Sequence, residues 1–167
     1  MRLFPLQLSL LLLLFSTPAF SFTALVVSVK DGDTIEVLSH GRATRIRLHG
    51  IDCPEKRQAY GYRAKIATAA LTFGRTVTIH PYDTDKYGRT VADVTLSDET
   101  NVNHLLVKDG WCWWYRKYAP DDPILEALEA EARHTKRGLW IDHNPVPPWV
   151  YRKLKHKQSA GVLEQQP

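Results

Sequence analysis

The chain has 167 residues and a formal net charge of +4, and it contains two cysteines and seven histidines. Its length suits one domain around one hydrophobic core and argues against two domains. It contains no HExxH or CxxC motif, which excludes a zinc site built on a recognised spacing.

The N-terminus has the form of a secretory signal peptide. Arg2 precedes an apolar run over residues 3–15, and the small-residue stretch STPAFS follows that run. The run is shorter than the ~20 apolar residues that span a bilayer, and an uncleaved anchor is the alternative. We expect cleavage after Ala19 or Ser21 and an exported mature protein, periplasmic or secreted, with no stable membrane association.

Alternation of apolar and polar residues predicts five short strands. It covers residues 25–30, 34–37, 45–49, 75–80 and 90–96. The first two strands are joined through KDGDT, in which Asp31-Gly32 is a strong signal for a tight turn.

Three helices are predicted from periodicity and end signals. The first covers residues 56–74, and its larger apolar side chains fall on one face: Tyr62, Ile66, Ala70 and Phe73. The second begins at the cap Asn101 and stops at Gly110. The third begins at the cap Asp122, carries acids early and bases late as the helix dipole favours, and ends at Gly138.

The segment beyond the third helix has a different composition. NPVPPW, residues 144–149, is predicted to be extended and stiff, and nothing after Lys157 indicates order. YRKLKHK, residues 151–157, has four Lys or Arg residues and no acid. Such a basic patch favours polyanions, and a solvated chain end is the alternative.

These elements predict an α+β fold that is mainly β, a five-stranded OB-fold barrel with about three helices. One helix lies between the third and fourth strands, and two follow the fifth. We see no internal repeat and no second domain. The predicted organisation is a signal peptide over residues 1–21, one OB-fold domain over 22–143 and a Pro-containing, basic tail over 144–167.

Two aspartates stand where predicted strands turn or end. Asp33 lies beside the first turn and Asp52 at the end of the third strand. Two such hard carboxylates can hold Ca²⁺ or Mg²⁺ if waters, a backbone carbonyl and the substrate complete the shell. For Asp33, turn chemistry is the alternative.

Glu55 follows Asp52 in the loop RLHGIDCPE. Pro54 restricts its neighbour to extended geometry, which keeps the two carboxylates apart, one for a metal and one for water. Glu55 is therefore a candidate general base for phosphodiester hydrolysis, which needs a positioned water and a proton acceptor. The alternative is a carboxylate that serves the dipole of the next helix.

Two arginines are candidates for binding phosphate. Arg47 in the third strand and Arg89 at the end of DKYGR each offer a planar fork of donors that pairs two phosphate oxygens. Lys86 and Tyr87 stand beside Arg89. The alternative is that these arginines are solvent-exposed and have no role in binding phosphate.

The stretch WCWWYRKY, residues 111–118, interleaves aromatic rings with cations, a combination that suits the stacking of nucleobases. We assign two of its three tryptophans to packing, and we take Tyr115 and Tyr118 as the stacking candidates. Cys112 in this stretch could pair with Cys53 in an oxidising compartment and stabilise the fold by about 4 kcal/mol. The sequence leaves this disulfide and two unpaired thiols open.

Four motifs, VKDGDT, RLHGIDCPE, DKYGR and KRGLW, occur in the order and approximate spacing of the staphylococcal nuclease (thermonuclease) family, which the chain resembles from about Leu25 to Trp140. The resemblance implies an OB barrel with helices. It also implies Ca²⁺-dependent hydrolysis of DNA and RNA, single-stranded or frayed, with cleavage on the 5′-oxygen side that leaves 3′-phosphates. We expect a monomer.

Carried over by position, the resemblance assigns a role to each motif residue. The implied Ca²⁺ ligands are Asp33, Asp52 and the backbone carbonyl of Cys53. The best-known member has threonine at the Cys53 position, but a backbone ligand tolerates that change. Glu55 would engage the attacking water, Arg47 and Arg89 the scissile phosphate, and Lys86 and Tyr87 a terminal phosphate.

Two other classes of function compete with the nuclease. One is a non-catalytic OB-fold module that only binds nucleic acid, and the other is an exported OB-type domain that binds a protein or a glycan. Degenerate members of this fold lose their carboxylates, whereas this chain keeps all the motif carboxylates and arginines. The sequence therefore favours the enzyme.

Overall fold

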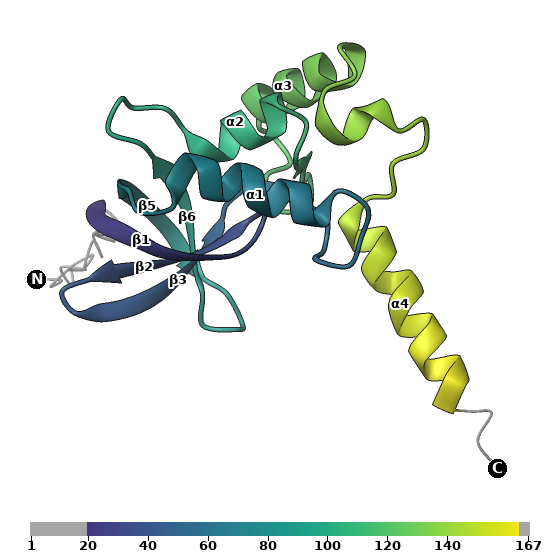
Figure 1. Cartoon of the computed structure of the whole chain (residues 1–167), viewed down its shortest axis with the longest axis horizontal. Coiled ribbons are helices and arrows are strands. Elements are labelled where there is room, and N and C mark those ends of the chain that lie inside the picture. Colours follow the sequence, from purple (N-terminus) through teal and green to yellow (C-terminus); the bar gives the residue numbers. More distant parts are fainter. Residues whose placement is uncertain (1–19, 164–167) are drawn as a thin grey trace, which may run out of the picture.

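A computed structural model of the chain describes residues 20–163, with side chains described as far as residue 158. Nearly all of the predicted signal peptide, residues 1–19, lies outside the described residues. Five strands of the described part close into a barrel in the order β1-β2-β3-β6-β5, which confirms the predicted α+β, OB-type architecture (Figure 1). They are β1 (Phe22–Asp31), β2 (Thr34–Ser39), β3 (Arg42–Leu48), β5 (Thr76–Thr84) and β6 (Thr90–Thr95).

The barrel closes through one parallel pair, β3 with β6, while its other neighbouring strands pair antiparallel. Alternate side chains of each strand point inward. The interior is filled by apolar side chains that are at most 1% exposed, among them Val26, Ile35, Ile46, Ile79 and Val94. Polar residues at the strand ends are thereby held on a closely packed frame.

A second, smaller sheet joins the barrel to the aromatic stretch. β4 (Ile51–Asp52) pairs antiparallel with β7 (Trp113–Trp114). Strands of two residues are too short to show a period in the sequence, so the strand prediction omits them. A disulfide between Cys53 and Cys112 lies directly beside this pairing, and both cysteines are buried. The structure thus answers the question that the sequence left open.

Within residues 20–163 there are four α-helices and one 3₁₀ helix: α1 (Gly61–Thr72), α2 (Val102–Lys108), α3 (Pro123–His134), η1 (Gly138–Ile141) and α4 (Pro148–Leu163). The predicted caps are correct, because Asn101 accepts from the N–H of His104 at 3.0 Å and Asp122 from that of Leu125 at 2.9 Å. α2 and α3 pack together, whereas α4 extends away from the barrel (Figure 1). None of these described helices has the length and apolar character needed to cross a membrane.

The buried face of α1 is opposite to the predicted one, which contains the larger apolar side chains. The exposed fractions of Tyr62, Ile66 and Phe73 are 69%, 49% and 61%, whereas Ala64 and Thr68 are fully buried. The helix lies close to the β1–β2 turn, where a Cβ on Gly32 would come within 2.9 Å of the Cβ of Ala64. The hydroxyl of Thr68 also donates to the carbonyl of Gly32 at 2.6 Å. Close approach therefore selects small side chains, and the predicted apolar face is turned to solvent.

The C-terminal segment also differs from its prediction. Residues 145–147 lie outside helices and strands, but α4 begins at Pro148 and continues past Lys157, where no order was predicted. Proline suits the first turn of a helix because no backbone hydrogen bond is required of it there. The ring of Trp149 meets the edge of Trp113 with centroids 5.6 Å apart. This tertiary contact fixes the start of the helix.

Candidate active site

The two predicted metal ligands, Asp33 in the β1–β2 turn and Asp52 in β4, meet at the guanidinium of Arg47. This arginine lies in β3 opposite Thr34 of β2. Its guanidinium binds the carboxylate of Asp33 at 2.9 Å and that of Asp52 at 3.1 Å. The two predicted metal ligands come from different elements and share one cation.

Asp33 is buried, and both of its oxygens have donors. Oδ2 accepts from the backbone N–H of Cys53 at 2.8 Å, and Oδ1 accepts from the hydroxyl of Thr34 at 3.1 Å. The disulfide holds Cys53 against Cys112. The β1–β2 turn and the loop RLHGIDCPE are therefore joined through one carboxylate, which is hydrogen-bonded as a buried polar group requires.

Asp31 belongs to this cluster, although the sequence indicates only a turn residue at this position. Its Oδ1 accepts from the N–H of Asp33 at 3.3 Å. Burial raises the pKa of Asp31 to about 7, the charge of Asp33 adds to the shift, and Arg47 opposes it. The available signal was the repeat Asp-Gly-Asp, which puts two carboxylates on one tight turn.

Arg152 of α4 binds both acidic residues of the loop. Its Nη2 donates to Asp52 Oδ2 at 2.7 Å, and its Nη1 donates to Glu55 Oε1 at 2.7 Å. Burial raises the pKa of Asp52, and the hydrogen bond from Arg152 opposes that rise. Burial disfavours the charged guanidinium, but the hydrogen bonds of Arg152 with both carboxylates outweigh burial and raise its pKa.

Arg152 is not among the predicted site residues, because its surroundings in the sequence indicate a basic tail. The signal that could have found it was a helix start, with Pro148 in the first turn and Trp149 as an apolar anchor. The structure also shows how Asp52 and Glu55 are arranged. Asp52 is 1% exposed, whereas the side chain of Glu55 is 40% exposed, so the loop holds one inner and one outer carboxylate.

Arg89 reaches the cluster from the loop between β5 and β6. Its Nη1 donates to the hydroxyl of Thr34 at 3.3 Å, and that hydroxyl in turn donates to Asp33. The ring of Tyr87 lies beneath two cations, 5.0 Å from Nζ of Lys86 and 5.4 Å from Cζ of Arg89. The structure thus brings the DKYGR loop to the same site as the carboxylates.

The aromatic candidates lie beside α4. Tyr115 stacks on Trp149 with centroids 5.2 Å apart and planes 5° from parallel, and Tyr118 meets Tyr115 edge-on at 5.0 Å. The N–H of Tyr115 donates to the carbonyl of Gly50 at 2.8 Å, which ties this pair to the loop of Asp52. Trp113 and Trp114 are buried, in agreement with the packing role assigned to two of the tryptophans.

The carboxylates form an all-oxygen donor set of the kind that Ca²⁺ and Mg²⁺ prefer. Among the described residues, no three His, Cys, Asp or Glu side chains are arranged to hold a metal ion. Asp33 and Asp52 are instead bridged by Arg47. Burial is the main cause of the raised pKa of Asp31, and the charge of Asp33 adds to it. This crowding of carboxylate oxygens fits a hard divalent cation.

A closed OB-type barrel with carboxylates and arginines gathered at its turns defines the class of protein. The family model described as staphylococcal nuclease homologue matches residues 45–142. An uncharacterized endonuclease of Escherichia coli O157:H7 is 45% identical over 148 residues, which is 87% of this chain and 96% of that protein. A micrococcal nuclease of Shigella flexneri is 40% identical over 151 residues, 84% of this chain and 87% of that protein. The chain belongs to the staphylococcal nuclease family.

Proposed function

We propose that the chain is an exported, Ca²⁺-dependent endonuclease that hydrolyses phosphodiester bonds of DNA and RNA. One observation carries this proposal: the guanidinium of Arg47 lies between Asp33 and Asp52, so a phosphate-binding group stands beside two hard carboxylates. The family and the relatives named endonuclease and micrococcal nuclease support the class of activity.

In the proposed reaction, Glu55 orients a water molecule and accepts its proton while the water oxygen attacks phosphorus. The bond between phosphorus and the 5′-oxygen breaks, and the 5′-oxygen takes up a proton from solvent and leaves as a hydroxyl. The phosphate remains on the 3′-oxygen. Arg47 and Arg89 bind the phosphate oxygens and stabilise the charge that develops on them. Asp33, Asp52 and the carbonyl of Cys53 would hold Ca²⁺, which when bound supplies further positive charge for the phosphate.

Two further groups of residues are proposed to bind parts of the substrate beyond the scissile phosphate. Lys86 and Tyr87 would contact a terminal phosphate, and Tyr115 and Tyr118 would stack bases. Stacking requires unpaired bases, so we propose single-stranded or frayed DNA and RNA as substrates of a monomeric enzyme.

One observation favours a non-catalytic binding module as the second candidate. Arg152 binds both Asp52 and Glu55 and so occupies the oxygens that a metal and a water would need. Digestion of single-stranded DNA by the purified protein, first with Ca²⁺ and then with a chelator, separates the two candidates. We expect cleavage with Ca²⁺ and none with the chelator, whereas binding without cleavage in both conditions would leave only the module.

The variant Glu55→Gln tests the general base. We expect kcat to fall by at least ~10²-fold, the usual scale for a positioned acid or base, while the unfolding transition stays in place because the side chain of Glu55 is 40% exposed. Near-normal turnover would show that Glu55 is not the general base. The alternative of a carboxylate serving the dipole of the next helix is already wrong, because α1 begins only at Gly61.

Export is supported by the disulfide between two buried cysteines, since such bonds persist in oxidising compartments. β1 begins at Phe22, directly after the predicted cleavage region. The mass of the protein recovered from the periplasm or medium of expressing cells tests this proposal, and a cytoplasmic, full-length product would contradict it.

A further inference from the structure

The first turn of α4 is fixed against the candidate site. Trp149 stacks on Tyr115, and the hydroxyl of Tyr151 donates to the carbonyl of Arg57 at 3.2 Å. The side-chain amide of Gln58 donates to the carbonyl of Val146 at 2.6 Å. This part of the helix therefore has a defined position beside the loop that contains Glu55.

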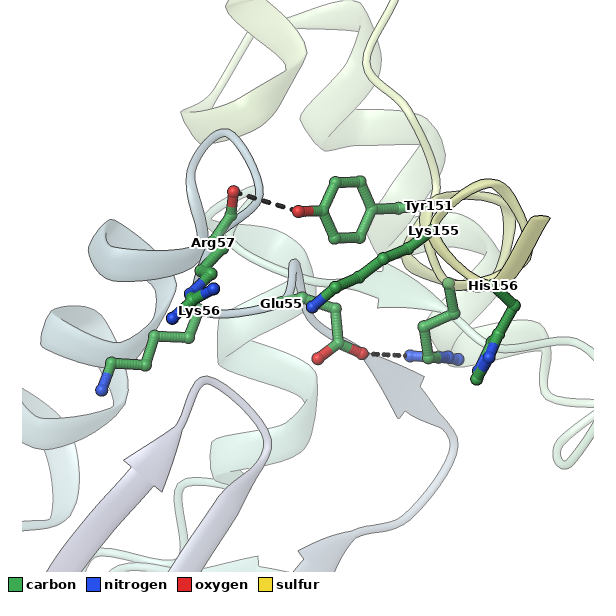
Figure 2. A pocket seen from close by; sticks show the side chains of 7 residues that line it. Glu55, Lys56, Arg57, Tyr151, Lys155 and His156 are labelled. Atoms are coloured by element: carbon green, nitrogen blue, oxygen red, sulfur yellow. Dashed lines mark hydrogen bonds and ion pairs between the residues drawn. The ribbon is translucent and has the colours of Figure 1, made fainter. Parts of the chain in front are cut away.

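A cavity of about 400 Å³ lies between α4 and residues 55–57 (Figure 2). Its lining comes from two elements, the loop and the helix, and consists of Glu55, Lys56, Arg57, Tyr151, Arg152, Lys155 and His156. Four of these side chains are Lys or Arg, and one is acidic. Because that acid is the candidate general base, the cavity adjoins the candidate active site.

We propose that this cavity is a groove for the phosphodiester backbone of the substrate strand beside the scissile phosphate, with α4 as its second wall. The inference rests on the nuclease function proposed above and extends its substrate site. Cations on two separate elements line one groove, an arrangement that suits the regularly spaced charges of a nucleic-acid strand.

Arg152 links the groove to the carboxylates. Without substrate its guanidinium is hydrogen-bonded to Asp52 and Glu55. A backbone phosphate in the groove would offer the same planar fork two further acceptor oxygens, which lysine could not pair in that way. A strand in the groove is therefore bound next to the group that positions the water.

Binding of a fluorescent single-stranded oligonucleotide, measured by anisotropy in chelator so that no cleavage occurs, tests the groove. The double variant Lys56→Gln/Lys155→Gln removes one cation from each wall. The matched control, Lys153→Gln/Lys157→Gln, loses the same charge from exposed positions of α4 that do not line the cavity.

We expect the groove variant to bind at least ~10-fold more weakly than the wild type at low salt, and the slope of log K against log[salt] to become shallower by about 1.4 for two lost phosphate contacts on a single strand. The control should stay within about 2-fold of the wild type in affinity. Equal losses in the two variants, or no loss in the groove variant, would overturn the proposal.

A comparison of substrate lengths distinguishes this inference from the proposed function. With Ca²⁺, kcat/KM of the groove variant should fall for a long oligonucleotide but not for a dinucleotide that contains only the scissile phosphate. Equal falls for both substrates would overturn the groove while leaving the nuclease in place. If the wild type cleaves neither substrate, the proposed function fails, and the binding comparison still decides the groove.

Discussion

At the scale of single residues, Asp85 determines where Arg89 points. Its carboxylate accepts from Nε of Arg89 at 2.8 Å and from the N–H groups of Tyr87 and Arg89 at 2.9 and 3.0 Å. Burial alone would raise the pKa of Asp85, but the hydrogen bonds from Arg89 and Tyr87 outweigh it and lower the pKa. Asp85 is thus a positioning residue for the proposed phosphate-binding arginine.

We expect Asp85→Asn to lower kcat by about 10-fold or more, because a hydrogen bond to a charged group contributes about 1.5–3 kcal/mol and Arg89 loses its main anchor. KM for a dinucleotide should change less than kcat. Asp83→Asn, in the same exposed stretch, is the control and should have normal kcat. Equal activities of the two variants would mean that Arg89 is held without Asp85.

Ionisation of Asp31 makes the stability of the fold depend on pH. Its pKa is raised from 3.8 to about 7 in the folded chain, so between these values the folded state binds a proton that the unfolded state has lost. The contribution of Asp31 to stability is therefore full below pH 3.8 and is lost as the pH rises towards 7.

Urea unfolding in chelator at pH 5 and pH 8 checks this sign. The wild type should lose more stability between the two values than Asp31→Asn, which has no carboxyl to ionise. Asp121→Asn, at an exposed position of a loop, should follow the wild type. Identical pH profiles for the wild type and Asp31→Asn would contradict the shift.

At the scale of elements, α1 shows that close packing can override the apparent apolar face of a helix. Ala64 is fully buried against the β1–β2 turn, whereas Ile66 on the opposite face is 49% exposed. We expect Ala64→Leu to destabilise the protein by about 1–3 kcal/mol through overpacking. Ile66→Gln should stay within about 0.5 kcal/mol of the wild type, as exposed positions do.

Chemical denaturation of these two variants measures both values. Because Gly32 joins Asp31 to Asp33, Ala64→Leu should also displace the carboxylates and lower the proposed nuclease activity. A larger loss of stability in Ile66→Gln than in Ala64→Leu would show that α1 packs with the face predicted from the sequence.

At the scale of the whole molecule, alternation and turn residues were enough to predict the five barrel strands, and ordered motifs were enough to bring Asp33, Asp52 and Arg89 into one site. What could not be predicted depends on contacts between distant segments. Arg152 binds Asp52 from a helix whose start is held by Trp149 against Trp113 and Tyr115. A local pattern can indicate that helix start but not the distant partners that it packs on. Likewise, which face of α1 is buried depends on how closely the helix approaches the β1–β2 turn.

The disulfide between Cys53 and Cys112 is a covalent constraint between distant segments. It joins the site loop to the residue before β7 across a sequence separation of 59. In the chain-entropy model, a loop of this length stabilises the fold by about 4 kcal/mol. We expect a reductant to lower the unfolding midpoint of the wild type by a corresponding amount. It should also lower activity, because Cys53 donates its N–H to Asp33.

The double variant Cys53→Ala/Cys112→Ala supplies the control for this experiment. It should unfold at the midpoint of the reduced wild type, and a reductant should leave that midpoint unchanged. The proposed Ca²⁺ site exists only in the folded chain, so a saturating concentration of Ca²⁺ should recover part of the lost stability in both proteins. A wild type whose midpoint and activity are indifferent to reductant would show that the barrel and β4–β7 hold the site loop without the covalent bond.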